Sequence, residues 1–542
     1  MKTSNIILLQ MGLSALLVFT MCCPVNPGLN TILTAHGNTD WHIDTAEEFI
    51  TGKDMKNNNT AANHVPSTWT GRHMHVGLTN TAHFYYDVDK TTPGDDANAT
   101  NGIDQAMLFF YAGHGSPTGW NTLGDNGTQS KMQLGDCPGY GLLRYYWQCS
   151  CEVFAHGPRT GTGATFDYSW PGKFTGGADS YDQRNIYERW GPALHPYLRM
   201  ACGASTPAYC HESQVNSIWN NYNNLGMEVS DAFIDGLTYY NNGVVPVCIT
   251  TGGFDVSTTP LNDLVFTNQA NISENTYYHI QYLGGFDRQL IQPFLMIRIP
   301  ELLPELELIP MPRPDPILRV QLEEQGDWLI AREQTKEKVP TIRINKLSGA
   351  VYLKENRMTQ LSTAVLSERE YLQKAQTFVK EKGWVENNMK LTEANHMMLE
   401  KQDKASEKKF DPIQKNVVIV FKRQVEVDGQ LIPVLGEGGQ IKIQLNNDGS
   451  VLNAAKIWRA VDVRATLKKT RVKPYETALE EARKRLPDRN AYKLERWDFG
   501  YEELAGNVEQ KVMKTVYHFY FVPENKEQFL EFPPMFMAVP AQ

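Results

Sequence analysis

Ala106-Met-Leu-Phe-Phe-Tyr-Ala-Gly-His-Gly115 is an apolar run that ends abruptly in a histidine between two glycines. A short apolar run of this kind predicts a buried strand. The run Leu142–Trp147 predicts a second buried strand, which ends in Gln-Cys-Ser-Cys-Glu at 148–152. In open α/β sheets, ligands and catalytic groups lie at the carboxyl ends of the strands. We therefore expect His114 and Cys151 to converge at one edge of a mostly parallel sheet.

The surrounding sequence has the alternation of strands and helices that is typical of an α/β domain. Apolar runs at 197–202 and 244–250 predict two more buried strands, and 184–196 and 213–238 have helical patterns. A polar extension rich in Asn, Thr and Gly precedes them. We assign residues 24–298 to this domain.

The two motifs together suggest nucleophilic catalysis. A thiol becomes a strong nucleophile when a neighbouring base promotes the thiolate, and an imidazole then protonates the leaving amine. The backbone N–H groups of Gly115 and Cys151 would form an oxyanion hole. The sequence thus nominates His114 and Cys151 as catalytic residues, and Cys149 competes with Cys151 for the role of nucleophile. The predicted reaction needs no cofactor.

A strand ending in His-Gly, followed about 35–50 residues later by a strand ending in Cys, resembles the caspase-like cysteine peptidases, which include metacaspases, legumains and gingipains. The resemblance is to uncharacterised exported microbial relatives of that group. It implies a caspase-like fold, a peptide or protein substrate, His114 for proton transfer and Cys151 as nucleophile. The acidic residue that basic-specific members carry just before the cysteine is absent here, since positions 148 and 149 are Gln and Cys. A preference for Arg or Lys is therefore not implied.

Two other interpretations stay open at this stage. The domain could be a catalytically inactive cell-surface binding or structural protein, with Cys151 inert or disulfide-bonded. It could also bind a metal through Cys149, Cys151 and His156, or through His73 and His75, although neither set has the paired Cys-x2-Cys spacing of structural zinc sites. Cys202 and Cys210 are close enough in sequence to form a local disulfide.

A proline-rich segment marks the end of the first domain. Residues 299–318 contain six prolines between Pro300 and Pro316, which favour an extended, semi-rigid connector. Beyond it, the sequence predicts a helix-plus-hairpin unit that is used about twice. The hairpins turn at Ser348-Gly349 and at Asn447-Asp448-Gly449, and the helices are expected at 368–384 and 475–486.

Leu431-Ile-Pro-Val-Leu-Gly436, followed by Ile441–Leu445 and Asp448-Gly449, resembles PepSY and thermolysin-propeptide domains. Such domains accompany secreted peptidases as inhibitors or folding aids. The resemblance implies an α+β accessory domain at 319–542 that contacts the first domain within the same chain.

The N-terminus and the composition suggest where the protein acts. Lys2 and the apolar run 6–21 predict a signal peptide at 1–23, either cleaved or of the lipoprotein type, with Cys22 and Cys23 at its end. Export to the periplasm, cell surface or medium is therefore expected, with membrane contact only through this segment. The net charge of −9 argues against nucleic-acid binding. The charge is uneven, with −11 on residues 1–300 and +2 on the remainder.

Overall fold

The computed structural model describes the chain in segments. We call the described residues before 299 the N-terminal part and those after 318 the C-terminal part. The described residues are 42–47, 71–76, 108–112, 115–116, 119–123, 129–133, 143–149, 154, 159–160, 165–166, 186, 190, 194, 198–205, 212–238, 244–267, 276–285, 298–309, 322–332, 341–355, 359, 361, 364–385, 388–461, 469–486, 488–524 and 535–542.

The first strands form a parallel group within the main sheet. Their order in space is β2-β1-β3-β7-β10, and each neighbouring pair runs parallel. Two antiparallel strands, β11 and β12, extend the sheet beyond β10. The bounds are His42–Glu47 (β1), Gly71–Val76 (β2), Leu108–Ala112 (β3), Tyr145–Cys149 (β7), Met200–Ala204 (β10), Pro246–Gly252 (β11) and Tyr277–Gly284 (β12).

The sheet continues without interruption into the C-terminal part. β12 pairs antiparallel with β19, from Tyr277 opposite Asp403 to Gly284 opposite His396. From β19 the order runs β20-β22-β23-β18-β17-β16-β15, antiparallel throughout. The bounds are Leu322–Gln325 (β15), Trp328–Arg332 (β16), Thr341–Asn345 (β17), Val351–Lys354 (β18), Met389–Asp403 (β19), Ile413–Val427 (β20), Gln440–Asn446 (β22) and Val451–Ile457 (β23).

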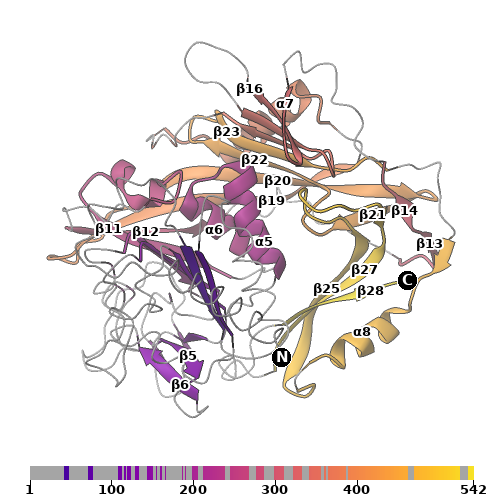
Figure 1. The fold of residues 1–542 in the computed structure, drawn as a ribbon, viewed down its shortest axis with the longest axis horizontal. Helices are drawn as coiled ribbons and strands as arrows, with labels where there is room; N and C mark the ends of the chain where they lie inside the picture. Colours follow the sequence, from indigo (N-terminus) through magenta and orange to yellow (C-terminus); the bar gives the residue numbers. More distant parts are fainter. Residues whose placement is uncertain are drawn as a thin grey trace, which may run out of the picture.

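A second branch leaves the far end of β20. There β20 pairs with β21, β21 pairs with β25, and β25, β27 and β28 continue as an antiparallel group packed with helix α8 around its own core (Figure 1). The start of the proline-rich segment packs here too, with Leu303, Leu306 and Leu308 buried. The bounds are Leu302–Pro304 (β13), Leu306–Glu307 (β14), Gln430–Leu435 (β21), Lys469–Arg471 (β24), Tyr492–Glu502 (β25), Val512–Met513 (β26), Thr515–Pro523 (β27), Met535–Pro540 (β28) and Tyr475–Arg483 (α8).

Helical segments α5, η7 and α6 lie between the N-terminal strands and the C-terminal strands (Figure 1). α5 spans Glu212–Asn220, η7 is a π-helical turn at Asn221–Leu225, and α6 spans Val229–Leu237. One hydrophobic core joins the three layers. It contains Phe110, Tyr145 and Trp147 from the N-terminal strands, Val215, Trp219 and Phe233 from the helices, and Tyr352, Val418, Val420, Ala455 and Ile457 from the C-terminal strands.

Helix α7, Glu368–Glu381, covers a separate core in the C-terminal part. It begins with a capping box in which Ser367 and Glu370 each bond the other's backbone N–H, and it buries Tyr371, Ala375, Phe378 and Val379. The short elements that complete the described set are Gly115–Ser116 (β4), Gly119–Leu123 (β5), Gln129–Gln133 (β6), Arg159–Thr160 (β8), Thr165–Phe166 (β9), Val256–Thr258 (η8) and Pro260–Asn262 (η9).

Many local predictions are confirmed. The apolar runs that predicted buried strands correspond to β3, β7, β10 and β11. The two predicted hairpin turns contain Gly349 and Gly449, whose φ angles of 72° and 78° suit glycine. The helices expected at 368–384 and 475–486 are α7 and α8. The pattern at 213–238 is helical but is broken between η7 and α6.

The predicted fold class is wrong for the molecule as a whole. The described main sheet is mixed and mostly antiparallel, and its nineteen strands come from both parts. A mostly parallel caspase-like α/β sheet with separate PepSY-like helix-and-hairpin units does not describe it. The reason is the pairing of β12 with β19 and the 15-residue length of β19 and β20. Strand pairing uses backbone groups that every residue has, so apolar periodicity did not reveal it.

Gly236 of α6 tests how closely the two helices pack. A Cβ added there would lie 2.5 Å from the backbone N and Cα of Ile218 in α5. Gly236→Ala should therefore destabilise the protein by about 1–3 kcal/mol, as overpacking does, although glycine-to-alanine in a helix usually stabilises. Urea unfolding measures the change. Gly285→Ala is the control, since nothing lies within 4 Å of its added Cβ. Equal effects of the two variants would contradict the close helix packing.

Candidate functional site

The strands that lead to the two predicted catalytic residues are neighbours. β3 and β7 pair in parallel, with Leu108 opposite Tyr145 and Ala112 opposite Cys149. The strands therefore end at the same level of the sheet. In the sequence, His114 follows Ala112 by two residues and Cys151 follows Cys149 by two residues. His114 and Cys151 themselves lie outside the described residues.

The other predicted oxyanion-hole residue, Gly115, begins β4. This two-residue strand pairs antiparallel with β5, with Gly115 opposite Trp120, and β6 completes a small three-stranded sheet. Gly115 thus starts a hairpin three residues beyond the end of β3. The predicted partner in the oxyanion hole, the N–H of Cys151, is not described.

The described cysteines are all disulfide-bonded. Cys202 of β10 is joined to Cys248 of β11, which lies directly opposite it in the sheet, with a Cα–Cα distance of 4.1 Å. The predicted Cys202–Cys210 disulfide is therefore wrong, because the sulfur of Cys202 is already bonded to that of Cys248. Cys149 is also disulfide-bonded. It has no free thiol to act as the alternative nucleophile or as a metal ligand.

A largely buried group of hydrogen-bonded side chains, which we call the polar anchor, holds the amino end of β7. Asp263 accepts hydrogen bonds from the hydroxyl of Tyr145 at 2.7 Å and from Nε and Nη2 of Arg199 at 2.9 and 2.7 Å. Burial raises the pKa of Tyr145 well above 10, and the Asp263 carboxylate adds to the effect, so the hydroxyl remains a donor. The anchor fixes the amino ends of β7 and β10 in register.

Aromatic packing holds the middle of β7. The Trp147 ring lies 5.1 Å from the Trp219 ring of α5 and 5.5 Å from the Phe233 ring of α6, measured between centroids. Phe266 completes the group at 5.4 Å. Because α5 and α6 pack on this face of β7, they set the position of the strand that ends two residues before Cys151.

Sequence reasoning missed a cluster of buried charges on α6. All nine residues of α6 are buried, including Asp231 and Asp235. Lys415 of β20 reaches across from the C-terminal part, with its Nζ 2.9 Å from Asp231 Oδ1 and 2.6 Å from Glu228 Oε2. Burial by itself would lower the pKa of Lys415, but the two carboxylates outweigh it and raise the pKa, so the lysine is charged.

Amide groups satisfy the remaining oxygens of Asp231. Its Oδ2 accepts hydrogen bonds from the amides of Asn416 at 2.8 Å and Gln444 at 2.7 Å, and Oδ1 accepts one from Gln281 at 2.5 Å. A buried carboxylate with this many donors is fully paired, as burial of a charge requires. One signal in the sequence was available, because two aspartates spaced i, i+4 in an otherwise apolar helix need buried partners.

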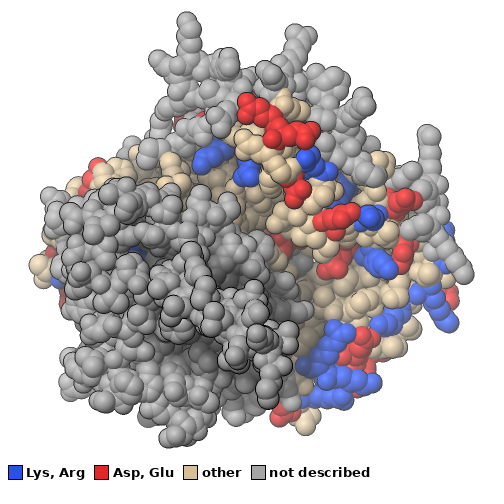
Figure 2. Space-filling view, in the orientation of Figure 1, with Lys and Arg blue, Asp and Glu red and all other residues tan. Residues whose placement is uncertain are grey.

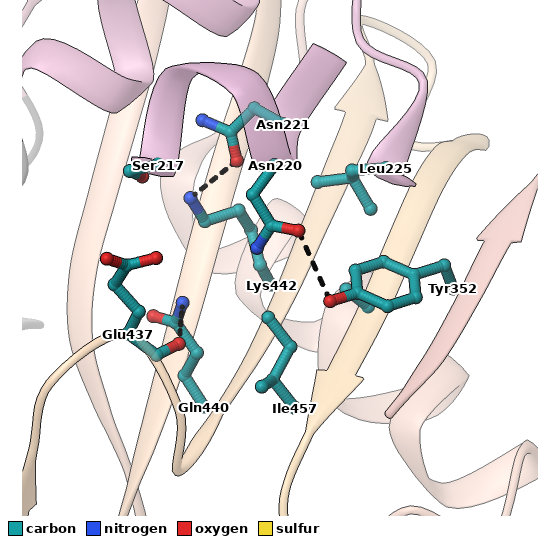
Figure 3. A pocket seen from close by; sticks show the side chains of 10 residues that line it. Ser217, Asn220, Asn221, Leu225, Tyr352, Glu437, Gln440, Lys442 and Ile457 are labelled. Atoms are coloured by element: carbon teal, nitrogen blue, oxygen red, sulfur yellow. Dashed lines mark hydrogen bonds between the residues drawn. The ribbon is translucent and has the colours of Figure 1, made fainter. Parts of the chain in front are cut away.

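A second ion pair lies one turn further along α6. Lys442 of β22 pairs with Asp235 and donates to the side-chain oxygen of Asn221 at 3.1 Å, while the Asn221 amide donates to Asp235 at 2.7 Å. Figure 3 shows the Lys442 ammonium directed at Asn221 and the Tyr352 hydroxyl directed at Asn220. Beside them is a cavity of about 10 Å³, also lined by Glu437, Gln440 and Ser217, with room for about one water molecule.

The charges that join the two parts are hidden from solvent. The visible face of the C-terminal part carries basic and acidic side chains interspersed with one another (Figure 2). By contrast, the buried charges are separated by sign. The N-terminal part carries the acidic residues Glu228, Asp231 and Asp235, and the C-terminal part carries the basic residues Lys415 and Lys442. The sequence-level imbalance in charge thus has a local counterpart at this interface.

Comparison with known proteins does not assign a family. No family model matches the chain, and no curated protein matches it. A structure of an uncharacterised protein from Eubacterium rectale is similar at 10% identity, with a TM-score of 0.26, over 44% of this chain and 84% of that chain. A likeness of this size supports no conclusion about fold or function.

The described residues bear on the metal-binding interpretation and on contact with a membrane. No group of three or more His, Cys, Asp or Glu side chains there is arranged to hold a metal ion. No helix in this part of the chain is long and apolar enough to cross a membrane. The predicted signal segment 1–23 and the side chains of His73 and His75 lie outside the described part of the chain.

The two carboxylates beside Lys415 should respond differently to substitution. Asp231→Asn removes the more extensively bonded partner of a buried lysine and should destabilise the protein by about 3 kcal/mol. Glu228→Gln should be tolerated better as the pH rises, because burial raises the pKa of Glu228 despite the opposing attraction of Lys415. The folded protein then binds this proton more tightly than the unfolded chain does. The contribution of Glu228 to the stability of the wild type is therefore lost as the pH rises from the ordinary glutamate pKa of 4.5 through the folded-state pKa.

The stability of Glu228→Gln relative to wild type should consequently increase with pH over that range. Denaturant unfolding at pH 4.5 and 7.5 measures it, with exposed Glu323→Gln as the control. A Glu228→Gln variant that becomes less stable than wild type with rising pH would contradict the assigned direction.

Proposed function

We propose that this chain is an exported cysteine endopeptidase in which Cys151 is the nucleophile and His114 transfers protons. The supporting observation is the register of β3 and β7, with Ala112 opposite Cys149. Residues that follow paired parallel strands by the same number of positions leave the sheet at the same edge. The equal offset of two residues is the basis for pairing His114 with Cys151.

The reaction follows from those two side chains. The Cys151 thiolate attacks the carbonyl carbon of a peptide bond, and the oxygen that becomes negative accepts hydrogen bonds from the N–H groups of Gly115 and Cys151. The imidazolium of His114 gives its proton to the leaving amine as the C–N bond breaks. Water, deprotonated by His114, then attacks the acyl carbon, and the C–S bond breaks to release the new carboxyl group and regenerate the Cys151 thiolate. The substrate is a peptide or protein, and the reaction uses no cofactor.

In this proposal the rest of the chain delivers and supports the site. Residues 1–23 direct export, and the C-terminal part acts on the peptidase within the same molecule, as inhibitor or folding aid. The competing proposal is an exported binding or structural protein without catalysis. The disulfide at Cys149 favours the competing proposal in one respect, since it shows that a cysteine two residues before the proposed nucleophile Cys151 is oxidised.

Thiol labelling tests the proposed dyad. An activated Cys151 should have a thiol pKa below about 8 and react with limiting iodoacetamide below pH 7. In His114→Ala the labelling rate near pH 6 should fall by about tenfold or more, because each unit of pKa changes the thiolate fraction tenfold. His156→Ala is the matched control, and Cys151→Ala should abolish peptide hydrolysis. Rates are measured by mass spectrometry between pH 5 and 9.

Disulfide mapping of the same protein supplies the decisive control. A non-reducing digest identifies the cysteine that is bonded to Cys149. If that cysteine is Cys151, or if Cys151 labels equally in wild type and His114→Ala, the peptidase proposal is wrong and the binding protein takes its place.

A further inference from the structure

The two parts are joined by an uninterrupted row of backbone hydrogen bonds between β12 and β19. β12 pairs with β19 along its whole length, so the C-terminal part satisfies the outer N–H and C=O groups of the last N-terminal strand. Without β19, β12 would be the open edge of the sheet, which is a template for misassembly. A detachable regulatory domain would not be expected to complete the sheet of the domain that it regulates.

The hydrophobic core crosses the same boundary. Trp219 and Phe233 on α5 and α6 belong to one buried cluster with Val418 and Val420 of β20 and Ile457 of β23. Removing the C-terminal part would expose the outer face of both helices. Burial of apolar area is the dominant favourable contribution to folding, so this shared core is the main source of cohesion between the parts.

The buried charges have a different role. Ion pairs taken out of water contribute little net stability, because desolvation offsets the attraction. They do select the partner, since a surface without Lys415 and Lys442 would leave Asp231 and Asp235 buried without counter-ions. A backbone contact adds to this selection, as Arg343 Nη1 donates to the carbonyl oxygen of Asn223 in η7 at 2.7 Å.

We infer that the C-terminal part is a folding template that stays permanently docked on the N-terminal part, and that it is not an inhibitor released on activation. Its described contacts run along the end of α5, along η7, α6 and β12, and to the backbone at Phe254 and Leu261, and β12 is separated from β7 by β10 and β11. In the described part of the chain, these contacts therefore lie mainly on the helices and on β12, three strands along the sheet from β7. The inference rests on the proposed function in one respect, that the supported site is a peptidase site.

Cutting the connector in the full-length protein tests the inference. A recognition sequence for a site-specific protease is inserted within 310–321, and the purified protein is cleaved to completion. We expect the two fragments to elute together under native conditions, with the circular dichroism of the uncut chain and a single thermal unfolding transition. The inference is overturned if the C-terminal fragment separates in non-denaturing buffer while the N-terminal fragment remains folded. Fragments that stay together while Cys151 is inert would sink the peptidase proposal and leave this inference intact.

A charge exchange tests the selection of the partner. Asp235→Lys and Lys442→Asp should each lower the yield of soluble full-length protein severalfold, because like charges then face each other in the buried interface. The double variant should recover most of the yield, since a half-turn of the Asn221 amide restores both of its hydrogen bonds with the charges exchanged. Exchanging the exposed pair Asp428 and Lys469 is the control, and it should leave the yield unchanged. A double variant no better than either single variant would overturn the role of these charges in selecting the partner.

Discussion

Helix α6 is buried on every side and carries two carboxylates, and the arrangement of the molecule follows from that constraint. A carboxylate cannot remain ionised in a core without counter-charges and donors. Asp231 and Asp235 find both on β20 and β22, from residues that lie between 184 and 213 positions further along the chain. The C-terminal strands must therefore pack on α6 in one register, because a shift of one residue would turn the lysines to the opposite face of the sheet.

This constraint extends to the candidate site through packing. α5 and α6 are fixed from one side by the C-terminal strands, and on the other side they contact the Trp147 ring of β7. At the opposite end, Asp263 ties Tyr145 to Arg199. β7 is thus held at its base by hydrogen bonds and along its length by aromatic rings. A strand held in this way leads into 150–152 from a fixed starting point, which is what a preorganised catalytic group requires.

Local structure was largely predictable from the sequence, and its assembly was not. Short apolar runs identified β3 and β7, and Ser348-Gly349 and Asn447-Asp448-Gly449 identified two hairpin turns, because these signals depend on a few adjacent residues. β19 escaped prediction since it mixes apolar residues with His396, Glu400 and Lys401, all of them buried. Charged residues in a strand usually indicate a solvated face. Here Lys401 donates to the carbonyl oxygen of Phe254, 147 positions earlier in the chain, and His396 contacts Gln414 on the neighbouring strand β20, so only the tertiary structure explains their burial.

The candidate site divides in the same way. The spacing of the motifs predicted that the strands before His114 and Cys151 would be parallel neighbours, and the register of β3 and β7 agrees. The disulfide between Cys202 and Cys248 could not be deduced, because several pairings of six cysteines are compatible with one sequence. Lys415 and Lys442 gave no sign of their role, since a lysine in a charged segment has no feature that marks it as buried.

The pairing of β12 with β19 also sets a timetable for synthesis. Gly284 completes β12, but Asp403, which lies opposite Tyr277 in the ladder, is made about 120 residues later. At ribosomal rates of about 5–20 residues per second, that interval lasts roughly 6–24 s. Throughout it, the nascent chain carries an unpaired strand and an acidic helix pair whose counter-ions do not yet exist. The order in which the two halves are translated therefore exposes this protein to trapping by other strands, and a synonymous codon change that slows translation between 285 and 403 would lengthen the exposure without altering a single amino acid.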